Sequence, residues 1–132
     1  MTIAWGGTMI LKTKNIDSMT VIYLHGRLDL FEAEIVEKDL FSIAESNNDN
    51  HLIIVLEGLD YLSSSGLRVF ISLKRHLNLN GRQLLLCNRS NNAVNIFLKI
   101  INIKDMLKIY KTEEEAIRHC GGNRKSLADK IA

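Results

Sequence analysis

The chain has 132 residues, of which 46% are hydrophobic and 24% are charged, and it contains no proline. This composition is that of one globular domain large enough to bury its own core, and it excludes a fibrous or disordered chain. The net charge of +2 is spread over 17 basic and 15 acidic residues and only 6% of the chain is aromatic, which argues against the clustered basic face of a nucleic-acid-binding protein.

The first predicted elements form a hairpin followed by a helix. Two β-rich segments, Met9–Thr13 and Met19–His25, are joined by a turn that contains Asn15 and Asp17, both of which favour turns. Over Phe31–Ser46, apolar residues recur at steps of three and four, which is typical of one buried helix face.

A buried strand, a second helix and another strand follow. The segment Leu52–Leu56 reads LIIVL, an unbroken aliphatic run that predicts a strand covered on both faces. A helical stripe then ends near Gly81, which can adopt the positive φ that terminates a helix; the stripe consists of Leu67, Phe70, Ile71, Leu73 and Leu77. The next apolar run, Leu84–Cys87, predicts a further buried strand.

The C-terminal third predicts two more helices around a short strand. Ser90 is positioned to cap a third helix, whose apolar residues are Val94, Phe97, Leu98 and Ile101. A short strand is expected over Lys108–Tyr110. Thr112 and Glu115 have the spacing of a capping box for a fourth helix, which is expected to end at His119 or Cys120, before Gly121 and Gly122.

The element order ββαβαβαβα predicts the α/β class. Its alternation indicates right-handed crossovers and a mostly parallel mixed sheet of about five strands, with about four helices and an antiparallel first strand. Residues 9–120 are expected to form the domain. Residues 1–8 and 121–132 have no clear periodicity, so we expect a flexible N-terminal extension and a C-terminal tail.

Three segments are expected at the carboxyl edge of the sheet, where such folds usually place their sites. They are Gly26–Asp29 (GRLD), Leu59–Gly66 (LDYLSSSG) and Asn88–Ser90 (NRS). Three serines precede Gly66, and helix capping requires only one hydroxyl. Both capping with ordinary loop chemistry and a functional loop are therefore open interpretations.

Enzyme, metal and cofactor motifs are not found around these residues. The serines lack the first glycine of a nucleophile elbow, and no lysine follows Gly66 as in a phosphate-binding loop. The four histidines are scattered singly, unlike the spaced ligands of a zinc site. His25 is a candidate base for a serine, or a packed strand-end residue; Asp29 is interpreted as a loop residue ion-paired with Arg27, and Asp60 as a turn former.

Composition also bears on the cellular setting. Cys87 and Cys120 are expected to be reduced, buried thiols. No signal peptide is recognisable, and the longest unbroken apolar run, Leu52–Leu56, is far shorter than the roughly 20 residues of a membrane span. We therefore expect a cytoplasmic protein that does not insert into a membrane.

The serine segment, read with its surroundings, resembles the STAS domain of bacterial anti-sigma factor antagonists. The resemblance rests on DYLSSSGLRVF with GRLD upstream, LLLCNRSNNAVNIFLKI downstream and the ending KIYKTEEEA, and it covers roughly Ile10–Cys120. It implies a STAS fold. In that family a serine in an acid-Ser-Ser/Thr-Gly-Leu turn is phosphorylated by the partner anti-sigma factor, an ATP-dependent serine kinase, and a metal-dependent phosphatase reverses the reaction.

By position, the resemblance makes Ser64 the phosphorylation site. Many family members have an aspartate where this chain has Ser63, which leaves Ser63 and Ser65 as alternative acceptors. The resemblance predicts a non-enzymatic regulator: unmodified, it binds the kinase and releases the sigma factor, and phosphorylation on Ser64 switches binding off. The alternative is a STAS subunit of a transporter or signalling assembly that acts as a constitutive interaction module.

The predicted partner-binding surface follows from this assignment. It comprises the serine turn and its flanks, namely Ser63, Ser64, Ser65, Gly66, Leu67 and Arg68, with Arg27, Asp29 and Asn88 as rim contacts. Leu62 and Leu67 are interpreted either as added contact area or as core. No cofactor, metal or nucleic acid is expected, and the sequence is compatible with a monomer or a weak dimer.

Overall fold

The computed structural model describes residues 2–5, 9–47, 50–88, 93–101 and 106–120. In these residues, one sheet contains six strands in the order of the chain: β1 Thr2–Trp5, β2 Met9–Ile16, β3 Met19–Leu28, β4 His51–Leu62, β5 Leu84–Cys87 and β6 Ile109–Tyr110. The helices are α1 Leu30–Ser46, α2 Ser64–Asn78 and α3 Ala93–Ile100, and residues 113–120 are also helical. The predicted α/β order is thus confirmed, with one added strand.

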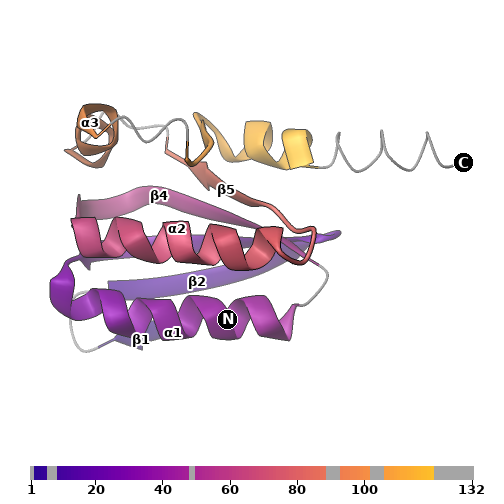
Figure 1. The fold of residues 1–132 in the computed structure, drawn as a ribbon, viewed down its shortest axis with the longest axis horizontal. Helices are drawn as coiled ribbons and strands as arrows, with labels where there is room; N and C mark the ends of the chain where they lie inside the picture. Colours follow the sequence, from indigo (N-terminus) through magenta and orange to yellow (C-terminus); the bar gives the residue numbers. More distant parts are fainter. Residues whose placement is uncertain (1, 6–8, 48–49, 89–92, 102–105, 121–132) are drawn as a thin grey trace, which may run out of the picture.

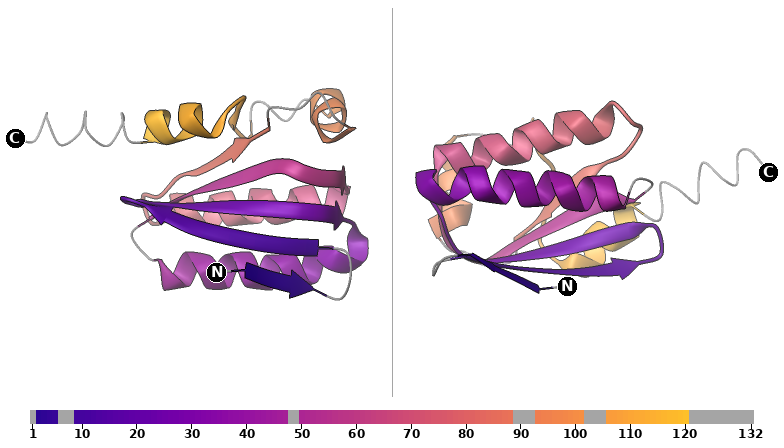
Figure 2. Two further views of the ribbon diagram at one scale, coloured as in Figure 1. Left: turned by 180° about the vertical axis from the view of Figure 1, so that it is seen from behind. Right: turned by 90° about the horizontal axis from the view of Figure 1, so that it is seen from below.

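The sheet is mixed, as predicted. β1 and β2 pair in antiparallel fashion, as do β2 and β3, whereas β3, β4, β5 and β6 are parallel to one another. Helices α1 and α2 cover one face of the sheet, and the helix over 113–120 lies on the other (Figures 1 and 2). The parallel connections from β3 to β4 through α1 and from β4 to β5 through α2 therefore run over one face of the sheet, as βα crossovers require.

Two hydrophobic clusters flank the central strand β4. Leu52, Ile54 and Leu56 belong to the large cluster beneath α1 and α2, whereas Ile53 and Val55 face the smaller cluster on the opposite side. Because side chains alternate between the two faces of a strand, a run of five aliphatic residues supplies both clusters at once. The prediction of a strand covered on both faces is confirmed.

The strands that lead to the serine turn are longer than predicted. Gly26–Leu28 continues β3, and Leu59–Leu62 continues β4, so neither segment is the expected loop. Two register shifts precede the pairing of Arg27 with Tyr61. Leu59 and Leu62 are buried in the large cluster, and their burial favours continuation of the strand through Asp60, which is therefore a strand residue and not the expected turn former.

The chain ends differ from the expectation where they are described. Thr2–Trp5 forms the edge strand β1, paired with Met9–Lys12, although it was assigned to a flexible extension over residues 1–8. Four residues carry too short a pattern for sequence periodicity to reveal, and pairing with β2 supplies the missing stabilisation. The predicted cap Ser90 and the tail over 121–132 lie outside the described residues.

Several local predictions are confirmed. Asp17 has a positive φ of 52° in the β2–β3 turn, and Gly81 has a φ of 71° just after α2. Thr112 Oγ1 accepts a hydrogen bond from the Glu115 amide at 3.1 Å, which starts the last helix. Cys87 and Cys120 are buried thiols that are not joined in a disulfide. In the described part of the chain, every helix is too short or too polar to cross a membrane.

Candidate functional site: the serine turn

The candidate site lies where α1 and α2 begin side by side. Both helices start at the carboxyl ends of their strands, at the left in Figure 1. The Ser63 amide donates a hydrogen bond to the Leu28 carbonyl at 2.9 Å. Because Leu28 ends β3 and Ser63 directly follows β4, this bond fixes the two helix starts relative to each other.

Ser63 is the N-cap of α2. Its Oγ accepts a hydrogen bond from the Gly66 amide at 3.0 Å, and such a cap typically stabilises a helix by about 1 kcal/mol. The capping interpretation is therefore confirmed for this one serine. Aspartate caps helices as well as serine does, so Ser63 in place of the usual aspartate retains this structural role.

The remaining residues of the turn differ in exposure. Ser64, the first residue of α2, is exposed, and Ser65 is half-buried. Gly66 is buried, and a Cβ built there would lie 2.7 Å from Leu28 Cγ and 2.9 Å from Leu62 Cδ1. A residue with a side chain at this position would collide with the two leucines, so the close approach of the helix start to the strand ends favours glycine.

The predicted rim residues are only partly at the surface. Arg27 is exposed, with its guanidinium carbon 4.6 Å from the centre of the Tyr61 ring. Asp29 caps α1, because its Oδ1 accepts a hydrogen bond from the Glu32 amide at 3.0 Å. Asp29 thus lies in the short loop between β3 and α1, as interpreted, but the expected ion pair with Arg27 is not found among the described residues, and the carboxylate of Asp29 caps the helix instead.

The other predicted contacts divide between surface and core. Arg68 is exposed on α2. Asn88 is only 4% exposed, so its side chain is not a surface contact in the free domain, and its backbone N–H donates to the Tyr110 carbonyl at 2.9 Å. Leu62 and Leu67 are buried in the large cluster, which confirms the core interpretation of both.

A comparison with known families assigns the fold. The family model for the STAS domain matches residues 11–116. The chain belongs to the STAS domain family. The resemblance that the serine segment carries is thereby confirmed, and the matched region spans the sheet from β2 to the last helix.

Several relatives of this STAS domain are named anti-sigma factor antagonists. The anti-sigma-B factor antagonist of Bacillus subtilis (strain 168) is 28% identical over 97 residues, which cover 74% of this chain and 86% of the relative. An anti-sigma factor antagonist from Mycobacterium paratuberculosis has a similar fold, with a TM-score of 0.75 at 15% identity over 89% of this chain and 98% of the other. The Bacillus cell fate determinant SpoIIAA, solved in a phosphorylated form, gives a TM-score of 0.60 at 23% identity over 83% and 97% of the two chains.

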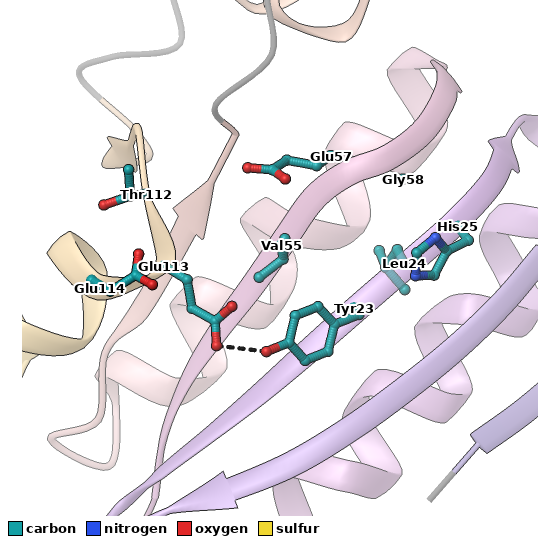
Figure 3. A pocket seen from close by; sticks show the side chains of 9 residues that line it. All are labelled: Tyr23, Leu24, His25, Val55, Glu57, Gly58, Thr112, Glu113 and Glu114. Carbon is teal, nitrogen blue, oxygen red and sulfur yellow. Dashed lines mark hydrogen bonds between the residues drawn. The ribbon is translucent and has the colours of Figure 1, made fainter.

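The STAS domain also has a pocket on the face opposite α1 and α2. Its volume is about 190 Å³, and Figure 3 shows it between β3, β4 and the start of the last helix. The lining consists of Tyr23, Leu24, His25, Val55, Glu57, Gly58, Thr112, Glu113 and Glu114. His25 thus lines this pocket, where it packs so closely over Gly58 that a Cβ there would collide with the imidazole.

A hydrogen-bonded group beside this pocket ties the last helix to the sheet. The Tyr23 hydroxyl donates to Glu113 Oε1 at 2.5 Å (Figure 3), and Lys14 Nζ lies 2.9 Å from the same oxygen. Burial alone would raise the pKa of Glu113, but the hydrogen bonds from Tyr23 and Lys14 outweigh it and lower that pKa below its ordinary value. Sequence analysis missed this group because Tyr23 and Glu113 are 90 residues apart in the sequence and the three residues belong to no motif.

Proposed function

We propose that this chain is an anti-sigma factor antagonist whose binding is switched by phosphorylation of Ser64. Unmodified, it binds an anti-sigma factor that is also a serine kinase, and so frees the sigma factor. A metal-dependent serine phosphatase restores the unmodified form, and the cycle takes place in the cytoplasm. The family membership and the names of its relatives support this assignment.

The position of Ser64 carries the proposal. Ser64 is exposed at the first position of α2, while its neighbour Ser63 is engaged in capping. A kinase can therefore reach the Ser64 hydroxyl without breaking a bond that the fold needs. In the reaction, Ser64 Oγ forms a bond to the γ-phosphorus of ATP, the bond to the ADP oxygen breaks, and the hydroxyl proton leaves to a base of the kinase.

The free domain would tolerate the phosphate well. A phosphate adds a charge of about −1.5 to −2, and the N-terminus of a helix stabilises an anion by about 0.3 to 1 kcal/mol. Arg68 follows Ser64 by four residues on the same helix and is exposed, a spacing that places the two side chains on one face. Phosphorylation of the free domain is thus expected to leave its stability nearly unchanged.

Bound to a partner, the same phosphate would be costly. The neutral hydroxyl of Ser64 is easily paired when it is buried at an interface, whereas an added charge without a matching cation costs several kcal/mol of desolvation. About 4 kcal/mol would convert a micromolar affinity into a millimolar one. The switch therefore requires no change of fold.

The proposed interface is the exposed part of the predicted one. Ser64, Arg27 and Arg68 are exposed, and Ser63, Ser65 and Asp29 are half-buried beside them. Gly66, Leu67 and Asn88 are buried, so we assign them a supporting role beneath the surface rather than direct contact.

Phosphorylation in vitro tests the proposal. The full chain is incubated with MgATP and each serine-kinase anti-sigma factor encoded by the same genome, and its intact mass is measured. We expect one phosphate on the wild type and on Ser63→Asn, which keeps a good N-cap, and none on Ser64→Ala. Equal modification of Ser64→Ala would refute the site.

Affinity measurements test the switch itself. We expect Ser64→Asp to bind the same kinase at least a hundredfold more weakly than the wild type, because even one charge at this position must be desolvated on binding. Equal affinities would refute the off switch. Recovery of a membrane transport complex and no kinase in a pull-down would instead favour the constitutive-module alternative.

A further inference from the structure

The first turn of α1 presents two large apolar side chains to solvent. Leu30 is 65% exposed and Phe31 is 82% exposed. They occupy the two helical positions that follow the N-cap Asp29, just as Ser64 and Ser65 follow the N-cap Ser63 in α2. Equivalent positions of two adjacent helices thus carry an apolar pair on one helix and a hydroxyl pair on the other.

The fold itself makes little use of this pair. The buried residues of α1 are Ala33, Val36, Leu40, Ile43 and Ala44, and Leu30 and Phe31 remain outside that set. Single exposed apolar residues are common on protein surfaces. Here, however, two adjacent ones stand at the same edge as Tyr61, which is 40% exposed, and Arg27, which lies over its ring. Tyrosine and arginine, the residue types of Tyr61 and Arg27, are enriched among the residues that dominate binding energy.

We infer that Leu30 and Phe31 are the apolar anchor residues through which the kinase partner binds this domain. The inference rests on the proposed function, since its occupant is the protein that must lie over Ser64 to sense a phosphate there. We expect that partner to have an apolar pocket that receives Phe31, next to the surface that contacts Ser64.

The size of a typical interface indicates that a partner bound over Ser64 also covers Leu30 and Phe31. A specific interface buries about 800 Å² on each partner, a patch roughly 30 Å across, whereas packed helices lie only about 8–10 Å apart. The hydrogen bond from Ser63 to Leu28 holds the starts of α1 and α2 together. A partner centred on Ser64 therefore also covers the first turn of α1.

The two helix starts then have separate tasks. Leu30 and Phe31 supply affinity through burial of apolar surface, which does not depend on whether Ser64 is phosphorylated. The phosphate on Ser64 supplies the charge that opposes binding. Burial of a phenylalanine side chain at an interface corresponds to roughly a tenfold to hundredfold gain in affinity.

Binding of exposed-residue variants to the kinase that phosphorylates the wild-type chain tests the inference. We expect Phe31→Ala to weaken binding about tenfold to hundredfold and Leu30→Ala to weaken it less, with no change in the thermal midpoint of either variant. Leu79→Ala is the matched control, because Leu79 is 86% exposed at the opposite end of α2. It should bind as the wild type does.

The outcomes separate this inference from the proposed function. If the kinase binds the wild type and modifies Ser64, but binds Phe31→Ala with unchanged affinity, the apolar anchor is refuted and the switch stands. An equal loss in Leu79→Ala would also refute it. If no serine-kinase anti-sigma factor binds or modifies the wild type, the proposed function fails, and the anchor fails with it.

Discussion

Replacement of Arg82 is expected to destabilise the domain more than any surface substitution. Arg82 is a charged residue that is only 7% exposed. Its Nε donates to the Asn50 carbonyl at 2.7 Å, and its Nη2 donates to the carbonyls of Ala44 and Asn47 at 3.1 and 2.8 Å. It thereby satisfies carbonyls at the C-terminal end of α1 and just before β4.

The expected loss in the free energy of unfolding of Arg82→Met depends on whether water can replace the hydrogen bond that each carbonyl loses. The substitution keeps an apolar stem of similar length but removes at least the three charge-assisted hydrogen bonds described above, each worth about 1.5–3 kcal/mol. The bonds to Asn47 and Asn50 are only partly buried, so water can replace them, whereas the bond to Ala44 is buried. Relief of the buried charge offsets part of the loss, and we expect a net cost of about 2–4 kcal/mol.

Equilibrium unfolding in urea measures this cost. The midpoint of Arg82→Met should fall by about 1–2 M with an unchanged slope, for a slope near 2 kcal/mol/M. Arg75→Met is the matched control, since Arg75 is exposed in the last turn of α2, and it should cost less than about 1 kcal/mol. Arg82→Lys should fall between the two, because an ammonium lacks the planar fork. If the Arg82 and Arg75 variants unfold at the same midpoint, the reasoning is refuted.

Two further substitutions probe the helix start and the opposite face. Gly66→Ala should cost about 1–3 kcal/mol, seen as a lower thermal midpoint, because its Cβ would lie 2.7 Å from Leu28 Cγ; an unchanged midpoint would contradict the close packing. Glu113 has a pKa below its ordinary value of 4.5, so its interactions with Tyr23 and Lys14 stabilise the fold at pH values above 4.5. This contribution is lost as the pH falls through the lower pKa of Glu113 in the native state. Urea midpoints should therefore fall less steeply on acidification in Glu113→Gln than in wild type or in Glu114→Gln, and identical profiles in all three would contradict the assignment.

Sequence patterns predicted the elements that are long enough to show a clear hydrophobic pattern. The helical stripes of α1 and α2 and the aliphatic runs in β4 and β5 each specify an element and the face that it buries, and the structure confirms them. Gly81 and Asp17 were likewise predictable, because a left-handed backbone restricts which residues can stand there.

The misassigned residues depend on partners that are distant in the sequence. Leu59 and Leu62 extend β4 because β3 pairs alongside them after a register shift, while the local sequence favours a turn. The sequence around Asp29 is compatible with an ion pair and with a helix cap, and the position at which α1 begins identifies Asp29 as a cap. Asn88 follows a strand like a loop residue, but it is buried, and its backbone amide donates a hydrogen bond to the carbonyl of Tyr110 in β6. In each case tertiary packing overrode a local preference.

The placement of the cap on Ser63 has a consequence for turnover. Since the hydroxyl that holds α2 is not the one that faces outward, a covalent mark on Ser64 leaves the scaffold intact. Repeated cycles of the proposed phosphorylation and dephosphorylation would therefore not require the domain to refold.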